Sequence, residues 1–212
     1  MKIVSIISAA IPDIKLVRFA RFPDDRGYFT EPFRASDLAA RPELTGLAGR
    51  AIVQINESFS RKGVIRGLHF QWNPFMGKLV RTLSGRMLDI VLDIRRGSPT
   101  LGRALLFEIT AAPSDPETDW IWVPPGFAHG NAFFDDTQIE YLCTGEYSPG
   151  NEAGINPFAP DIDWASADQR LRGELEGLRA AGPVISVKDA AGLSLSAWLD
   201  DPRSRQFMYG RC

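Results

Sequence analysis

Most of this chain is a succession of short runs rich in β-branched and aromatic residues, separated at close intervals by Gly, Pro, Asn and Asp. The pattern extends from Ile3 to about Ser148 and is typical of strands joined by tight turns, such as Ser84–Arg86 and Arg96–Pro99. The expected strands include Ala51–Asn56, Lys78–Leu83, Met87–Ile94, Ala104–Thr110, Trp120–Val123 and Gln138–Cys143. So many short strands in series predict a mainly β fold, either a sandwich or a jelly-roll barrel.

Signals for helices are few, and they lie towards the two ends of the strand-rich part. A short helix is expected at Ser36–Ala40 and a clearer one at Ser166–Arg179, with Ser166 as its N-cap and leucines at helical spacing. A last helix is expected at Ala190–Leu199, before a tail over about residues 200–212. With 212 residues and no linker-like segment, we expect one domain over residues 1–212, with a helical insertion at about 166–180.

Composition narrows the class of function. The chain has 24 basic and 26 acidic residues and therefore a net charge of -2. This balance does not predict the basic surface that is typical of a nucleic-acid-binding protein. No apolar run is long enough for a membrane span, and the run from Ile3 to Ile11 is better explained as a first strand than as a signal peptide. Cys143 and Cys212 have no metal-binding or disulfide spacing. We therefore expect a cytoplasmic protein that acts on small molecules.

Chemically versatile side chains are concentrated in the stretch from Arg66 to Lys78. A guanidinium, the His69 imidazole and an ammonium fall within 13 positions, in a region that predicts two strands joined at Asn73-Pro74. The other of the two histidines, His129, follows the turn-like Pro124-Pro125-Gly126. Both histidines are therefore candidates for a functional site.

A catalytic metal is one use for these histidines. Such a site usually needs three protein ligands, of which two commonly lie close together in the sequence of a β-helix barrel. His69 and His129 are 60 positions apart and no His-x-His pair exists. We therefore expect no metal and no cofactor, although the two histidines could still meet in space with a glutamate.

Without a metal, an imidazole is best suited to act as a general base. Proton abstraction from carbon also needs a cation at the oxygen where charge develops, which Lys78 or Arg66 could supply. It further needs an acid, for which Tyr141 is a candidate, although a tyrosine on a strand can equally be a packed core residue. In Ala51–Asn56 the polar Gln54 and Asn56 alternate with apolar residues, and we expect their face to border a pocket.

A series of motifs extends over about residues 15 to 190. They are Asp25–Glu31, Gln54–Ser58, Gly63–Gln71, Gly77–Arg81, Asp93–Thr100, Trp122–Gly130, Tyr141–Cys143, Glu146–Pro149 and Ser186–Asp189. In these motifs and in their order, the sequence resembles the dTDP-4-dehydrorhamnose 3,5-epimerase family.

The resemblance implies a metal-free, cupin-type double-stranded β-helix, usually a homodimer, that epimerises C3 and C5 of a dTDP-4-keto-6-deoxy sugar in deoxysugar biosynthesis. It implies that His69 is the base and Asp189 the carboxylate that orients it. Tyr141 matches the acid and Lys78 the group that stabilises the enolate. The substrate-binding positions implied are Arg26, Phe29, Glu31, Gln54, Asn56, Arg66, His129 and Lys188, part of which reach the site from a partner subunit.

The chain departs from the family pattern in places that bear on the site. A predicted helix separates Asp163 from Ser186–Asp189, so Asp161 or Asp163 are alternatives to Asp189 as the partner of His69. The loop Trp72–Met76 is bulky and apolar, and Asn131 stands where an apolar residue is usual. A C3-only epimerase, a 4-keto sugar isomerase, a sugar-nucleotide-binding cupin without activity and a metal-dependent cupin enzyme therefore remain alternatives.

Overall fold

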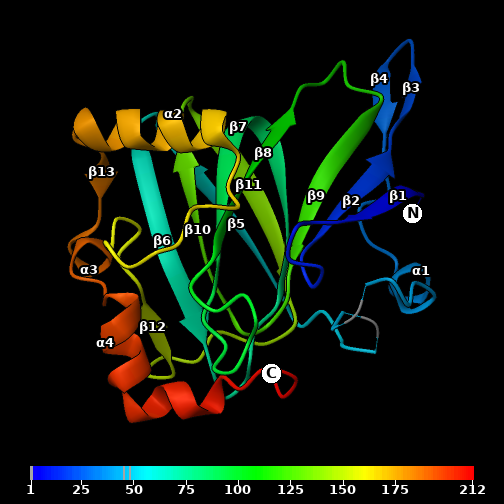
Figure 1. The fold of residues 1–212 in the computed structure, drawn as a ribbon. Helices are drawn as coiled ribbons and strands as arrows, with labels where there is room; N and C mark the ends of the chain where they lie inside the picture. The colour runs from blue at the N-terminus through cyan, green and yellow to red at the C-terminus, as the bar shows by residue number, and fades with distance from the viewer. Residues whose placement is uncertain (1, 45, 48) are drawn as a thin grey trace.

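The computed structural model describes residues 2–44, 46–47 and 49–212, and most of its ordered elements are strands (Figure 1). The helices are α1 (Ala35–Ala39), α2 (Gln169–Ala180), α3 (Val187–Ala190), α4 (Leu195–Asp200) and the 3-10 helix η1 (Pro202–Gln206). The strands are β1 (Ile3–Ser8), β2 (Lys15–Ala20), β3 (Phe22–Asp24), β4 (Gly27–Phe29), β5 (Gln54–Ser60), β6 (Val64–Gln71), β7 (Lys78–Asp93), β8 (Ala104–Ala111), β9 (Glu117–Val123), β10 (Phe127–Phe133), β11 (Thr137–Cys143), β12 (Glu152–Gly154) and β13 (Val184–Ile185).

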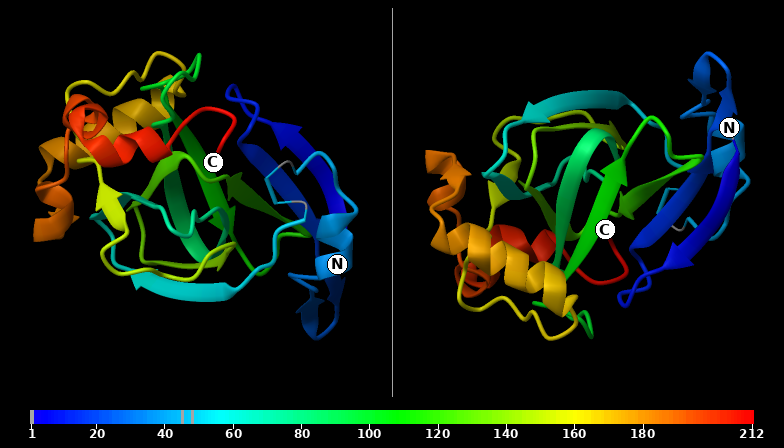
Figure 2. Two further views of the ribbon diagram at one scale, coloured as in Figure 1. Left: turned by 90° about the horizontal axis from the view of Figure 1, so that it is seen from below. Right: turned by 90° about the horizontal axis from the view of Figure 1, so that it is seen from above.

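The long strand β7 belongs to both layers of the barrel. Its first part, from Lys78, pairs with β9 and β11, and its second part, from Gly85, pairs with β8 and β10. One layer also contains β1, β2 and β5, and the other contains β6, β12 and β13. Figure 2 shows the two layers curving around a common interior. The predicted mainly β jelly roll is therefore confirmed.

The predicted turn at Ser84–Arg86 is wrong, because these residues lie inside β7. Gly85 has a φ of +89°, and a Cβ there would lie 2.7 Å from the carbonyl oxygen of Asp136. The glycine therefore permits a bend at which the strand passes from one layer to the other, instead of reversing the chain. In a sequence, a glycine flanked by polar residues is equally typical of a turn that reverses the chain and of a bend inside a continuous strand.

Three apolar cores hold the layers together. One lies between the sheets and contains Val80, Val91 and Phe127; a second covers the outer face of β2, β7 and β9. The third lies on the outer face of β6, β7 and β10, where Leu171 and Leu175 of α2 and Trp198 of α4 pack. The C-terminal helices thus act as the cover of one sheet, as Figure 1 also shows. Among the described residues no helix is long and apolar enough to cross a bilayer.

The helical predictions near the C-terminus are correct in place but not in their ends. Helix α2 begins at Gln169, and its N-cap is Asp168, whose side chain accepts a hydrogen bond from Leu171 N–H, rather than Ser166. Only the second half of the predicted helix at Ala190–Leu199 is one continuous helix, α4 from Leu195; α3 already ends at Ala190. A Cβ at Gly192, between the two, would lie 2.6 Å from the backbone nitrogen of Asn156, so a close approach of two loops interrupts the helix.

Strands β6 and β10 approach each other unusually closely at two glycines. A Cβ on Gly67 would lie 2.6 Å from Cα of Gly130, and a Cβ on Gly130 would lie 2.4 Å from the carbonyl oxygen of Arg66. Both distances involve backbone atoms, which cannot move aside without shifting a strand. The register of the pair changes at this point, between His129 and Asn131.

We expect Gly130→Ala to lower the free energy of unfolding by ~1–3 kcal/mol, because the added methyl group overpacks the crossing of β6 and β10. Urea denaturation followed by circular dichroism measures this change. Gly173→Ala is the matched control: Gly173 lies in α2 with no atom within 4 Å of the added Cβ, and the change should raise the free energy of unfolding by ~0.5–1 kcal/mol. Equal stability of the two variants would contradict the close approach.

Candidate active site

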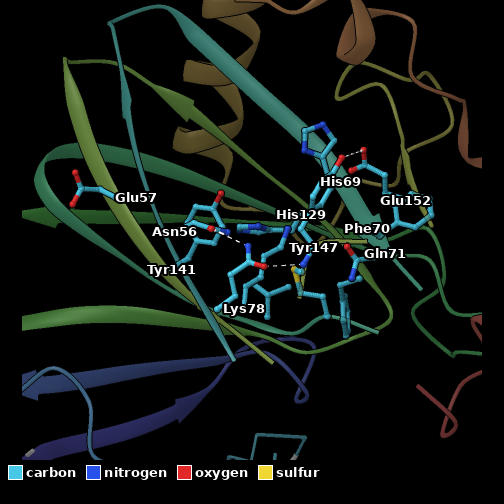
Figure 3. A pocket seen from close by; sticks show the side chains of 14 residues that line it. Asn56, Glu57, His69, Phe70, Gln71, Lys78, His129, Tyr141, Tyr147 and Glu152 are labelled. Carbon is cyan, nitrogen blue, oxygen red and sulfur yellow. Dashed lines mark hydrogen bonds between the residues drawn. The ribbon is translucent and has the colours of Figure 1, made fainter. Parts of the chain in front are cut away.

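A cavity with two lobes opens inside the barrel, and four side chains border both lobes. Figure 3 shows the first lobe. These shared residues are His69, Lys78, His129 and Tyr141. The first lobe, of about 410 Å³, is also bordered by Gln54, Asn56, Gln71, Met76, Tyr147 and Glu152. The second lobe, of about 530 Å³, is also bordered by Ser58, Arg66, Asn131, Ile139, Ile185 and Asp189. Each volume suits part of a small-molecule ligand.

Four different strands supply the shared residues. His69 on β6 is the direct neighbour of His129 on β10. Tyr141 on β11 is the neighbour of Val80 on β7, two residues after Lys78. Because side chains alternate along a strand, Lys78 and Tyr141 lie diagonally on the same inner face. The predicted pocket-facing side of Gln54 and Asn56 is also observed, since both border the first lobe.

His69 forms a close pair with Asp189, with 2.6 Å between Nε2 and Oδ1. Oδ2 of Asp189 accepts a hydrogen bond from the backbone N–H of Gly67, and Ser186 Oγ accepts one from the backbone N–H of Asp189. Burial lowers the pKa of the His69 imidazole below its ordinary value, and the Asp189 carboxylate offsets part of that change. His69 is therefore held as a neutral base over a wider range of pH than an exposed histidine.

The alternative partners of His69 lie elsewhere. Asp161 accepts hydrogen bonds from the backbone N–H groups of Leu195 and Ser196, at the start of α4. Asp163 accepts one from the backbone N–H of Ala165. The chain reaches Asp189 through β13, which pairs in parallel with β6 and so brings the following residues beside His69.

The second histidine, His129, also has a carboxylate partner. Its Nε2 lies 2.7 Å from Oδ2 of Asp89, and the same oxygen accepts a hydrogen bond of 2.9 Å from Asn131. Asp89 is completely buried and His129 is 7% exposed. Asp89 was not among the residues predicted from the sequence, although a single acid within the apolar run Met87–Leu92 was a usable signal, because a buried acid usually has a partner.

Burial also changes the acidity of the other two shared side chains. It lowers the pKa of the Lys78 ammonium, an effect that the carboxylates of Asp89 and Glu152 oppose. Burial raises the pKa of the Tyr141 phenol, and Asn56 opposes the change. The cavity thus combines a neutral imidazole, a lysine amine that is a cation when protonated, and a protonated phenol, the parts required for acid–base chemistry at a carbon next to a carbonyl.

Polar and charged side chains connect across the rim of the first lobe. Glu152 Oε1 accepts hydrogen bonds from the Tyr147 hydroxyl at 2.9 Å and from the Lys188 ammonium at 2.6 Å. Arg66 borders the second lobe and donates to Ser60 Oγ. Sequence reasoning did not select Tyr147 or Glu152, since a tyrosine in a loop and an acid on a short strand carry no signal by themselves.

Three of the predicted binding residues do not border either lobe of this chain. Arg26 and Phe29 lie on the β3–β4 hairpin, which projects from the barrel in Figure 1, and Phe29 is 67% exposed. Arg26 pairs with Asp24 at 2.6 Å, and Glu31 accepts from Arg34. Within the part of the chain that the structure describes, no group of three or more His, Cys, Asp or Glu side chains is arranged to hold a metal ion.

The fold and the four shared residues define a cupin-type barrel whose interior cavity carries side chains suited to acid–base chemistry. Residues 8–197 match the family model described as dTDP-4-dehydrorhamnose 3,5-epimerase. The chain belongs to the dTDP-4-dehydrorhamnose 3,5-epimerase family.

Individual relatives support this assignment. The dTDP-4-dehydrorhamnose 3,5-epimerase of Neisseria gonorrhoeae is 38% identical over 190 residues, which are 88% of this chain and 51% of that protein, so the chain spans about half of its length. The 3,5-epimerase of Legionella pneumophila, solved with dTDP-4-keto-L-rhamnose, has a TM-score of 0.77 and 32% identity, and the alignment covers 94% of this chain and 96% of that one. ChmJ of Streptomyces bikiniensis, a 3'-monoepimerase, has a TM-score of 0.72 and 25% identity, with 91% and 88% covered.

We expect the His69 imidazole to titrate with a midpoint below about 6.5, the ordinary value for histidine, because burial disfavours its charged form. NMR titration of nitrogen-15-labelled histidine measures this midpoint, and His129→Gln leaves His69 as the one remaining histidine signal. Asp189→Asn should lower the midpoint further, since the carboxylate that favours the charged ring is removed. A higher midpoint in Asp189→Asn would contradict the observed pair.

Proposed function

We propose that this protein is a dTDP-4-dehydrorhamnose 3,5-epimerase, which inverts C3 and C5 of a dTDP-4-keto-6-deoxy sugar. The observation that carries the proposal is the common cavity of His69, Lys78 and Tyr141, in which a base, a cation and an acid border the same space. Membership of the family and the likeness to an epimerase solved with dTDP-4-keto-L-rhamnose support the choice of substrate.

In the proposed reaction His69 removes the proton on the carbon next to the C4 ketone. Asp189 accepts the Nε2–H of the ring, which leaves the other ring nitrogen free to take the proton from carbon. The electron pair of the broken C–H bond moves to the C4 oxygen and forms an enolate. The Lys78 ammonium stabilises that oxygen, an interaction that lowers the barrier by ~3–4 kcal/mol.

Inversion requires that the new proton arrive on the opposite face of the sugar ring. Tyr141 lies on β11 and His69 on β6, so the acid and the base come from different strands around the cavity. The raised pKa of the phenol keeps the proton on Tyr141 until the enolate forms. The Tyr141 phenolate then takes a proton from solvent and the His69 imidazolium releases its proton to solvent, so that the same sequence at the second carbon can complete the reaction.

We further propose that the protein acts as a homodimer whose β3–β4 hairpin contributes to the partner's site. Three observations support this proposal. The hairpin carries Arg26 and the exposed Phe29 away from its own cavity. The outer face of β5 exposes Ile55 and Phe59, at 59% and 57%, and this strand pairs on one side with β11. An exposed apolar face on an edge strand is typical of a protein interface.

The diphosphate of the substrate carries negative charge, and the cations near the two lobes suit it. Arg66 borders the second lobe, and Lys188 lies at the rim with 61% of its side chain exposed. Both cysteines are free thiols, which is typical of a reducing compartment. We therefore place the reaction in the cytoplasm.

We expect the protein to incorporate solvent deuterium at C3 and C5 of dTDP-4-keto-6-deoxyglucose in deuterated water, and His69→Ala to abolish incorporation at both carbons. Loss of a general base lowers a rate by about 10²–10⁴-fold. NMR of the product locates the label carbon by carbon. Circular dichroism of His69→Ala checks that this variant is folded.

The outcome at each carbon decides between the alternatives. Label at C3 alone would replace the proposal with a C3 epimerase, as ChmJ is described. Tight binding of the nucleotide sugar without any label would indicate a binding protein. Label at both carbons in a folded His69→Ala variant would contradict the assignment of the base.

The shared site predicts activity in a mixture of two inactive variants. His69→Ala lacks the base, and a second variant with Arg26→Ala and Phe29→Ala lacks the hairpin contacts. After unfolding and refolding together, a mixed dimer contains one site with the normal His69 of one subunit and the normal hairpin of the other. Deuterium incorporation should therefore return in the mixture, whereas sites built within single subunits would leave it inactive.

A further inference from the structure

Asn131 is a buried amide on the wall of the second lobe. It lies on β10 two residues after His129 and on the same inner face of the strand, between Arg66 on β6 and Asp89 on β7. Its exposed fraction is 6%. A polar side chain this deeply buried is costly unless its polar atoms have partners. The partners of its two ends therefore indicate what the residue does.

The NH₂ end of Asn131 has two partners, both of which are acceptors. Nδ2 donates to Oδ2 of Asp89 at 2.9 Å and lies 3.1 Å from Sδ of Met87. A thioether has no hydrogen to donate, and the Asp89 oxygen also faces Nε2 of His129 at 2.7 Å. Turning the amide over would place its oxygen against both acceptors. The surroundings therefore determine which way the Asn131 carbonyl points.

The carbonyl end of Asn131 has no hydrogen-bond partner among the residues that the structure describes. The Asn131 carbonyl oxygen is not fully enclosed by protein. In contrast, Oδ1 of the neighbouring Asp89 is enclosed and has no partner among the described residues. Since Asn131 borders the second lobe, this oxygen opens into the cavity. The site thus presents a fixed acceptor that only a ligand or water can satisfy.

We propose that the Asn131 carbonyl accepts a hydrogen bond from the hydroxyl group at C2 of the sugar, an inference that rests on the proposed epimerase function. In a 4-keto-6-deoxy hexose the C4 oxygen is an acceptor and C6 is a methyl group, so the sugar's donors are the hydroxyls at C2 and C3. The C3 hydroxyl changes sides when that carbon is inverted. The C2 hydroxyl keeps its configuration and can hold the ring throughout the reaction.

A comparison of two substrates tests this assignment. Wild-type protein and Asn131→Leu, a variant of similar volume without the acceptor, are assayed on the dTDP-linked 4-keto-6-deoxy sugar and on its 2-deoxy analogue. We expect Asn131→Leu to lower kcat/KM about three- to tenfold on the first sugar, the value of one hydrogen bond, and to have no such effect on the analogue. Met87→Leu is the matched control, because it removes the other partner of the amide and leaves the carbonyl in place.

The design separates a substrate contact from a structural role. If Asn131 acts only by supporting Asp89 and His129, the kcat/KM of the variant falls by the same factor on both sugars. This result would overturn the assignment. Asn131→Ala, which removes the acceptor and adds no apolar bulk, provides the same comparison if Asn131→Leu does not fold. Wild-type protein that exchanges deuterium on neither sugar would overturn the epimerase function, whereas exchange with equal losses on both sugars overturns only the role of Asn131.

Discussion

The backbone hydrogen bonds of β7 are the interaction on which the rest of the structure depends. This strand pairs with β9 and β11 through its first part and with β8 and β10 through its second part. The bend at Gly85 lets one strand serve both layers. Its inner face carries Lys78, which borders the cavity, and Asp89, which pairs with His129 and Asn131 of the cavity wall, so the pairing that closes the barrel also positions the site. Fold and site therefore share one framework.

The free-energy cost of burying polar groups inside this barrel is offset partly by pairing between these groups and partly by the apolar core. His69 and His129 each face a carboxylate, and such pairs reduce the cost of removing a charge or a dipole from water. Asp89 Oδ1 is enclosed without a partner among the described residues. Such an atom lowers the stability of the native state, and the apolar core between the sheets offsets this cost. The cavity is thus kept polar at the expense of stability, as is usual at a functional site.

The C-terminal part of the chain connects the outer cover of the barrel to its interior. Helix α2 packs Leu171 and Leu175 on the outer face of the β6 layer, and Glu174 pairs with Arg86 of β7. The chain then forms β13 beside β6 and delivers Asp189 to His69. The helix that separates Asp189 from the preceding motif is therefore a spacer across the sheet, and it explains how a distant carboxylate reaches the imidazole.

Much of the fold was predictable, because the alternation of apolar and polar residues in a strand is local: Gln54 and Asn56 face the cavity as expected. The types of side chain that make acid–base chemistry possible, such as His69 and Tyr141, are likewise properties of the sequence. The sequence did not decide that residues 84–86 continue a strand, that Asp89 is the partner of His129, or that the hairpin of Phe29 leaves its own cavity. Only the tertiary structure decided these points, since neighbours across a sheet are chosen by hydrogen bonds between segments far apart in the chain.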